Sequence, residues 1–353
     1  MLKKLSKQKI SDIITYGIVL VAFIVMQILI NAGQISSLFE GLMVPLCTYI
    51  ILAISLNLVV GVLGELSLGH AGFMCVGAFT SAFFSKCMQD TITNSIVRFL
   101  IALLIGIVVA AIFGLLIGIP VLRLNGDYLA IVTLAFGEII KNIVNVLFIG
   151  KDSKGFHFST KDVMALNMEP DGKVIVNGPQ GITGAPKDAT FFIGFILVLI
   201  TLFLVLNLIH SRDGRAIMAI RDNRIAAESI GINITKYKLM TFTISAAMAG
   251  AAGVLYGHNL SNLTANTNNF GYNMSINILV FVVLGGIGNI RGSIISAVVL
   301  TLLPELLRGL SDYRMLIYAI VLIVMMLFNW APKAIEWREK YLSFKKNKKE
   351  AVK

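Results

Sequence analysis

Charge is scarce in this sequence, and acidic residues are the scarcer kind. Only 14% of the 353 residues are charged, whereas 57% are hydrophobic. So little charge excludes a soluble globular domain and is typical of a polytopic membrane protein. The 30 Lys and Arg outnumber the 19 Asp and Glu. Because the basic residues flank apolar runs and are not interleaved with exposed aromatics, they predict membrane topology and argue against nucleic acid as a partner.

Residues that build catalytic and metal sites are also few. The three cysteines, Cys47, Cys75 and Cys87, show no ligand spacing, so we predict neither a zinc site nor a disulfide framework. The four histidines are scattered, and no H-E-x-x-H run supports a membrane enzyme. No G-x-x-x-x-G-K-[ST] loop occurs that could cradle nucleotide phosphates. We therefore expect no enzyme activity, no metal and no cofactor in this chain.

Apolar runs of spanning length are, in contrast, abundant. A helix needs about 20 apolar residues to cross a bilayer, and clear runs lie near 14–30, 42–63, 96–119, 128–149, 191–209, 239–258 and 314–330. Two more apolar regions are interrupted, 64–85 by "GELSLGHAG" and 275–307 by "GGIGNIRGS". We predict an all-α, polytopic integral membrane protein of about ten transmembrane helices with Gly-rich broken segments.

Basic clusters orient these helices. Residues 1–13, the loop 210–238 and the tail 331–353 carry dense Lys and Arg, which the positive-inside rule places in the cytoplasm together with both termini. An even number of crossings must then separate each pair of clusters. This condition holds if 64–85 crosses once and 275–307 crosses twice. The membrane domain is then 14–330, with one large external loop at 150–190.

Small residues inside the predicted helices indicate close packing, and polar residues there are candidates for a translocation path. Gly250, Gly253 and Gly257 belong to a small-residue ladder that lets helix backbones approach closely in lipid. Ionisable groups at membrane depth mark candidate pathway residues. Glu138 and Lys141 are three apart on one helix face, so we expect them to pair with each other. The broken segment 64–85 supplies the candidates for a translocation lining, with hydrogen bonding between helices as the alternative: Glu65, Ser67, His70 and Gly72.

The charged stretch "GRAIMAIRDNRIAAESIGINITKYK", residues 214–238, separates two apolar runs. Its apolar residues fall at helical spacing, which predicts a short amphipathic helix and then a turn at Gly231, where glycine can take a left-handed conformation. With its small residues outward, such a helix suits a groove of another protein, or else anchors the loop in lipid headgroups. The candidate residues for such docking are Arg215, Arg221, Ala226, Ala227, Glu228 and Gly231.

The run from Ile225 to Gly231 resembles the coupling-helix motif E-A-A-x-x-x-G of ABC importer permeases, with Ile225 in place of the first Glu. The segments "GELSLGHAGFMCVGAF", "GPQGITGAP" and "LGGIGNIRGSIISAVV" resemble, in the same order, motifs of the branched-chain amino acid permease family. The resemblance runs from about residue 42 to 328 and is closer to the LivM-like half of that family than to the LivH-like half.

This resemblance implies a permease subunit of a binding-protein-dependent ABC importer for branched-chain or related amino acids, in the plasma membrane of a prokaryote. The implied partners are a second, related permease subunit, two cytoplasmic ATPase subunits that bind the ATP, and an extracytoplasmic solute-binding protein. The stretch 214–231 would act as a rigid lever between the ATPases and the bundle. Two alternatives stay open: a related permease for urea, short amides or nucleosides, and an ion-coupled transporter whose broken segments form inverted repeats.

Overall fold

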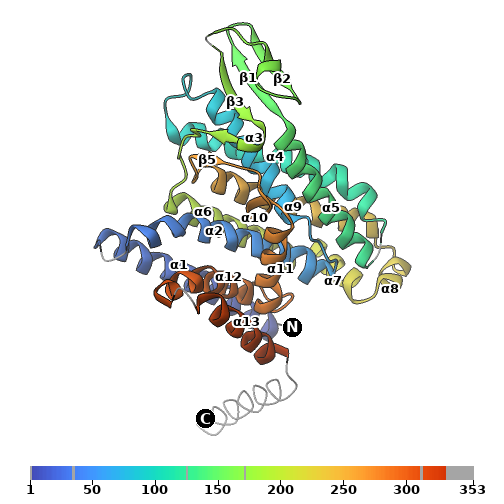
Figure 1. Cartoon of the computed structure of the whole chain (residues 1–353). Coiled ribbons are helices and arrows are strands. Elements are labelled where there is room, and N and C mark those ends of the chain that lie inside the picture. Colours follow the sequence, from blue (N-terminus) through green and yellow to red (C-terminus); the bar gives the residue numbers. More distant parts are fainter. Residues whose placement is uncertain (1, 34–35, 125, 171, 311–312, 331–353) are drawn as a thin grey trace.

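The computed structural model describes residues 2–33, 36–124, 126–170, 172–310 and 313–330, so the predicted basic tail 331–353 lies outside the described residues. Helices dominate the described chain (Figure 1). The longer helices are α1 (Leu2–Asn31), α2 (Ser37–Asn57), α3 (His70–Cys87), α4 (Ser95–Val121), α5 (Asp127–Val146), α6 (Phe191–His210), α9 (Ile234–Gly257), α11 (Tyr272–Gly285), α12 (Ile290–Leu306) and α13 (Arg314–Trp330). The shorter ones are α7 (Arg212–Asp222), α8 (Arg224–Ser229) and α10 (Thr267–Phe270).

The helical spans predicted before residue 260 are confirmed as helices. Within the described residues, seven stretches are long and apolar enough to cross a membrane: Asp12–Asn31, Phe39–Leu63, Ser95–Val121, Asp127–Val146, Phe191–His210, Ile234–Gly257 and Ile290–Gly309. The helices α3, α11 and α13 are not among these seven, and they have 18, 14 and 17 residues respectively. The protein is therefore a mostly helical, multi-pass membrane protein.

The prediction of an all-α protein is wrong between α5 and α6. Strands β1 (Phe148–Asp152), β2 (Gly155–Ser159) and β3 (Lys173–Asn177) form an antiparallel sheet in the order β2-β1-β3. Strand β4 (Ile182–Thr183) pairs with β5 (Asn262–Leu263), which follows α9. Backbone groups outside a helix need other partners, and pairing between strands supplies them. The sheet projects from the bundle at the top of Figure 1.

Both interrupted regions are broken, as predicted. Helix α2 continues into a π-helix at Leu58–Leu63, and Gly64 follows with a left-handed φ of 82°. Helix α3 begins only at His70, so the residues between are not helical. The second region divides into α11 and α12, which are joined by a turn at 286–289. Each break leaves backbone groups that must be satisfied by other parts of the protein.

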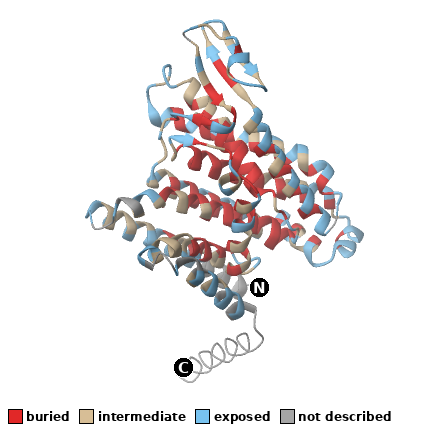
Figure 2. Cartoon of the chain, in the orientation of Figure 1, coloured by how far each residue is buried: buried red, intermediate tan, exposed pale blue. Residues whose placement is uncertain are grey.

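The core lies where α2, α3, α4 and α9 pack together, within the red part of Figure 2. A Cβ on Gly250 would lie 2.4 Å from the Ala110 Cβ on α4. A Cβ on Gly253 would lie 2.0 Å from the Met74 carbonyl oxygen on α3. The glycine ladder of α9 therefore brings its backbone against both neighbours, as small residues do in membrane helices.

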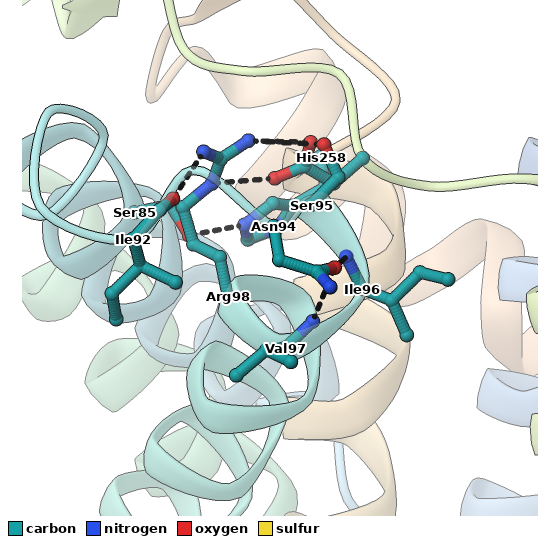
Figure 3. A network of polar contacts seen from close by, with 9 residues as sticks. Ser85, Ile92, Asn94, Ser95, Ile96, Val97, Arg98 and His258 are labelled. Atoms are coloured by element: carbon teal, nitrogen blue, oxygen red, sulfur yellow. Dashed lines mark hydrogen bonds and ion pairs between the residues drawn. The ribbon is translucent and has the colours of Figure 1, made fainter.

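A buried polar cluster joins the ends of several helices near the sheet (Figure 3). Near the start of α4, Arg98 donates to Asp188 through Nε at 2.9 Å and Nη2 at 2.7 Å, and to the Ile92 carbonyl oxygen at 3.0 Å. At the end of α9, His258 Nε2 shares a hydrogen bond of 2.8 Å with Ser85 Oγ of α3. We call Arg98, Asp188, Ser85 and His258 the Arg98 network.

Candidate functional site

The predicted coupling loop, 210–238, folds into two short helices. Ser211 Oγ accepts from Gly214 N at 3.0 Å and caps α7, and Asn223 Oδ1 accepts from Ala226 N at 3.0 Å and caps α8. Asn223 itself is extended, with φ −157° and ψ 107°. Because this residue interrupts the helix, the prediction of one rigid lever over 214–231 is wrong. The turn at Gly231 is present, with a left-handed φ of 84°.

Helix α8 presents large apolar side chains outward. Ile225 is 81% exposed and Ile230 is 75% exposed. Ala226, Glu228 and Gly231 are exposed beside them. Exposed apolar side chains grouped on a small helix are typical of a binding surface. The sequence interpretation did not count Ile225 and Ile230 among the candidate coupling residues, although both are apolar residues within the motif from Ile225 to Gly231.

Ala227 points the other way, so the prediction of outward small residues holds for Ala226 and is wrong for Ala227. It is only 2% exposed and packs with Ile220 of α7 and Ile234 of α9. This small cluster holds α8 against the rest of the loop. Ala227 therefore supports the outward face of α8 from behind and does not form part of it.

The two arginines predicted for coupling make different contacts. Arg215 Nη1 donates to the His210 carbonyl oxygen at 3.2 Å, within the loop itself. Arg221 Nη1 donates to the Gly61 carbonyl oxygen of the π-helix at 2.9 Å. A Cβ on Gly64 would lie 2.6 Å from Arg221 Cγ, so glycine makes room for this side chain. Arg221 thus connects the coupling loop to the broken end of α2.

A second tether joins the same two regions. Lys238, near the start of α9, forms an ion pair with Glu65, directly after the π-helix. Their side chains are 4% and 15% exposed, so the pair is largely removed from solvent. Breaking such a pair leaves a buried charge without its partner, which costs about 3 to 5 kcal/mol. The end of the coupling loop and the broken segment are therefore held together.

The other predicted lining residues are packed inside the chain. Ser67 is 0% exposed, and His70 is 2% exposed with Nε2 bonded to Ser55 Oγ at 2.8 Å. A Cβ on Gly72 would lie 2.7 Å from the Gly137 Cα of α5. The contacts of His70 and Gly72 agree with the alternative, hydrogen bonding and packing between helices, whereas the buried Ser67 hydroxyl has no hydrogen-bond partner among the described residues. A role in lining a path stays a prediction for these residues.

Asn57 joins the two broken segments to each other. Its Oδ1 accepts from Gly288 N at 2.9 Å, and its Nδ2 donates to Ser293 Oγ at 2.8 Å. A Cβ on Gly61 would lie only 2.3 Å from Gly288 N, so the close approach requires glycine. Sequence reasoning missed Asn57, whose signal was an amide inside the apolar run 42–63. The coupling loop, the π-helix and the 286–289 turn thus form one continuous set of contacts.

Residues 37–328 match the model of the family described as "Branched-chain amino acid transport system / permease component". This chain belongs to that family. The LivM permease proteins of the high-affinity branched-chain amino acid transport systems of Salmonella typhimurium and Escherichia coli K12 are each 35% identical to it over 296 residues. The match covers 81% of this chain and 67% of each relative.

Two further permease proteins match at lower identity. The LivH permease protein of Salmonella typhimurium is 25% identical over 287 residues, covering 79% of this chain and 89% of that protein. The fructose import permease protein FruG of Bifidobacterium longum is 25% identical over 344 residues, covering 94% of both chains. No solved structure matches significantly. The higher identity to LivM agrees with the predicted LivM-like half.

Proposed function

We propose that this chain is one of two related membrane subunits of a binding-protein-dependent ABC importer for branched-chain amino acids, in the plasma membrane of a prokaryote. Its partners are a second permease, two cytoplasmic ATPases that bind the ATP, and an extracytoplasmic solute-binding protein. One observation carries the proposal: the outward apolar face of α8 lies on a loop that is tethered to the broken helices. Such a face fits docking into a groove of an ATPase.

About ten crossings, with both termini in the cytoplasm, fit the contacts between helix ends. Arg221, Gly61 and Gly288 bring the coupling loop, the end of α2 and the α11–α12 turn together at one end of the bundle. The Arg98 network joins the end of α3, the start of α4 and the end of α9 at the other. We therefore place the coupling loop in the cytoplasm and the sheet outside.

The contacts of Arg221 and Lys238 connect the coupling loop mechanically to the helices of the bundle. When the ATPases close, α8 moves with its docking groove, and Asn223 lets it turn relative to α7. Arg221 and Lys238 pass that displacement to Gly61 and Glu65, and Asn57 extends it to the 286–289 turn. Both broken segments then rearrange together, which is a coupling between two sites through packed contacts.

The substrate class is argued from the relatives. The LivM proteins that match are named for high-affinity branched-chain amino acid transport. The FruG match, whose name concerns fructose, is less similar at 25% identity. Leucine is therefore the first substrate to test, and fructose, urea and a nucleoside complete the panel.

Uptake into proteoliposomes tests this function. The vesicles hold this chain with its candidate partner permease and ATPases, with and without internal ATP and the binding protein. Labelled leucine should enter only when every component is present. ATP-dependent uptake of another panel member without leucine uptake would refute the substrate class. Uptake by this chain alone, driven by an ion gradient, would refute the import machine.

A further inference from the structure

Helix α5 carries an ion pair in the second half of the span Asp127–Val146. Glu138 Oε2 lies 2.5 Å from Lys141 Nζ, so the pairing expected from their spacing is present. The side chains are 24% and 10% exposed, which places the pair at the edge of the chain's surface. Charged groups at such depth are costly and characteristically mark substrate paths or partner contacts.

Polar side chains continue from this pair along the surfaces of α5 and α11. Asn142 is exposed and lies four residues after Glu138, hence on the same helix face. On α11, Tyr272 is 45% exposed, Asn277 is exposed and Asn273 is partly exposed. Amide groups facing hydrocarbon would lose their hydrogen bonds, which favours water or protein beside these amides, although Ile139, Ile143 and Ile276 are exposed on the same two helices. We call these polar side chains the α5–α11 polar face.

Both members of the ion pair are fixed by contacts from the chain that follows α9. Glu138 Oε1 accepts from Tyr272 N at 2.8 Å, at the first residue of α11. Lys141 Nζ donates to Thr267 Oγ1 at 3.3 Å. A carboxylate offers about four lone-pair sites and an ammonium group three donors. Glu138 can therefore accept one more hydrogen bond and Lys141 can donate one more, while their present contacts keep both side chains in position.

We infer that Glu138 and Lys141 form a passing subsite for the charged end of a free amino acid. The carboxylate of Glu138 accepts from the substrate's ammonium group, and Lys141 donates to its carboxylate. Exchanging partners in this way keeps every charge paired, which avoids leaving an uncompensated charge at membrane depth. A sugar or urea offers neither charge, so the subsite favours zwitterions. This inference rests on the proposed function as an amino acid importer.

The test compares two neutralised ion pairs of the same spacing in the complete reconstituted importer. Glu138→Gln with Lys141→Gln removes both charges of the subsite. The matched control, Glu305→Gln with Arg308→Gln, neutralises an i,i+3 pair of 2.9 Å at the end of α12. Leucine imported per ATP hydrolysed should fall at least ~10-fold in the first variant and stay within ~2-fold in the control, because a change of 1.4 kcal/mol alters an equilibrium tenfold.

Two outcomes would overturn the subsite. The first is leucine import per ATP within ~2-fold of the unsubstituted importer when Glu138 and Lys141 are neutral. The second is failure of the importer to assemble even in Glu138→Gln alone, whose amide oxygen can still accept from Tyr272 N; the pair would then serve only to hold α11. The unsubstituted importer separates the two proposals, because its failure to import leucine refutes the proposed function itself.

Discussion

The Arg98 network and the coupling loop lie at opposite ends of the bundle, and they differ in which kind of side chain is exposed. Arg98 and Asp188 have side chains that are 7% and 4% exposed, so charged groups are buried and paired. In the coupling loop, Ile225 and Ile230 are 81% and 75% exposed, so large apolar groups lie outside. The first arrangement is completed by the chain itself, whereas the second calls for a partner.

Lys86 adds further contacts within the chain at the end of the bundle that carries the sheet. Its Nζ donates to the carbonyl oxygens of Val174, Ile175 and Thr183 at 3.2, 3.4 and 2.8 Å. One ammonium group thereby fixes β3 and β4 to α3. Long-range polar contacts therefore hold the sheet end in place. Between β1 and β3, Phe158 and Met164 are also 65% and 89% exposed, so exposed apolar side chains are not confined to the coupling loop.

The largest expected effect comes from breaking the buried ion pair between Arg98 and Asp188. Arg98→Met leaves Asp188 buried without its cation, and the free energy of unfolding should fall by about 3 to 5 kcal/mol. Unfolding in mixed micelles measures this. The control is Lys173→Met, whose pair with Asp90 is 3.5 Å long and 80% and 87% exposed, and which should change stability by less than ~1 kcal/mol. Equal losses in the two variants would contradict the comparison.

The next effect concerns docking at the coupling loop. Ile225→Asp with Ile230→Asp should weaken binding of the ATPases to the purified permease pair at least ~100-fold, because apolar anchors at an interface contribute about 2 kcal/mol or more each. Stability of the bundle should change by less than ~0.5 kcal/mol per site. Thr235→Asp, at another exposed site of the loop, is the control. Unchanged ATPase affinity would assign α8 to the lipid headgroups instead.

A smaller effect is expected where the loop meets the bundle. Arg221→Met removes the hydrogen bond to the Gly61 carbonyl oxygen, and a bond from a charged donor is worth about 1.5 kcal/mol or more. We expect the ATPases to stay bound while leucine import per ATP falls about tenfold. Arg215→Met, whose bond stays within the loop, should leave this ratio unchanged. Loss of ATPase binding in Arg221→Met would place this arginine at the interface.

The smallest effect is a dependence of the sheet on pH. Partial desolvation raises the pKa of Asp152, but hydrogen bonds from the backbone of Glu169 and Lys154, the His157 side chain and Gly155 N outweigh it, so the pKa lies below its usual value. The ionised carboxylate therefore stabilises the folded hairpin, and this contribution disappears as the pH falls through the lowered pKa.

Cleavage by pepsin can follow this transition as the pH falls through the lowered pKa and Asp152 becomes protonated. Cutting within β1 and β2 should increase as the pH falls. Asp152→Asn should be cut more readily than the unsubstituted chain at pH values above the lowered pKa and should change less on acidification. Identical cleavage of the two proteins at every pH would show that this carboxylate does not stabilise the hairpin.

Sequence alone determined the features that local composition encodes. Apolar length fixed the helices before residue 260, because a bilayer admits only segments whose backbone is satisfied internally. Glycine and polar residues fixed the breaks at 64–69 and 286–289, because they interrupt an apolar helix. The i,i+3 spacing fixed the pairing of Glu138 with Lys141. Each of these signals acts within a few residues along the chain.

Only the tertiary structure decided which residues face one another. Ala227 is buried and Ile225 is exposed because α8 packs on Ile220 and Ile234, which a local motif does not specify. Asn57 meets Gly288 at a sequence separation of 231 residues, and Arg221 meets Gly61 at a separation of 160. Such contacts depend on the summed packing of distant segments, and local periodicity carries no information about which segments become neighbours.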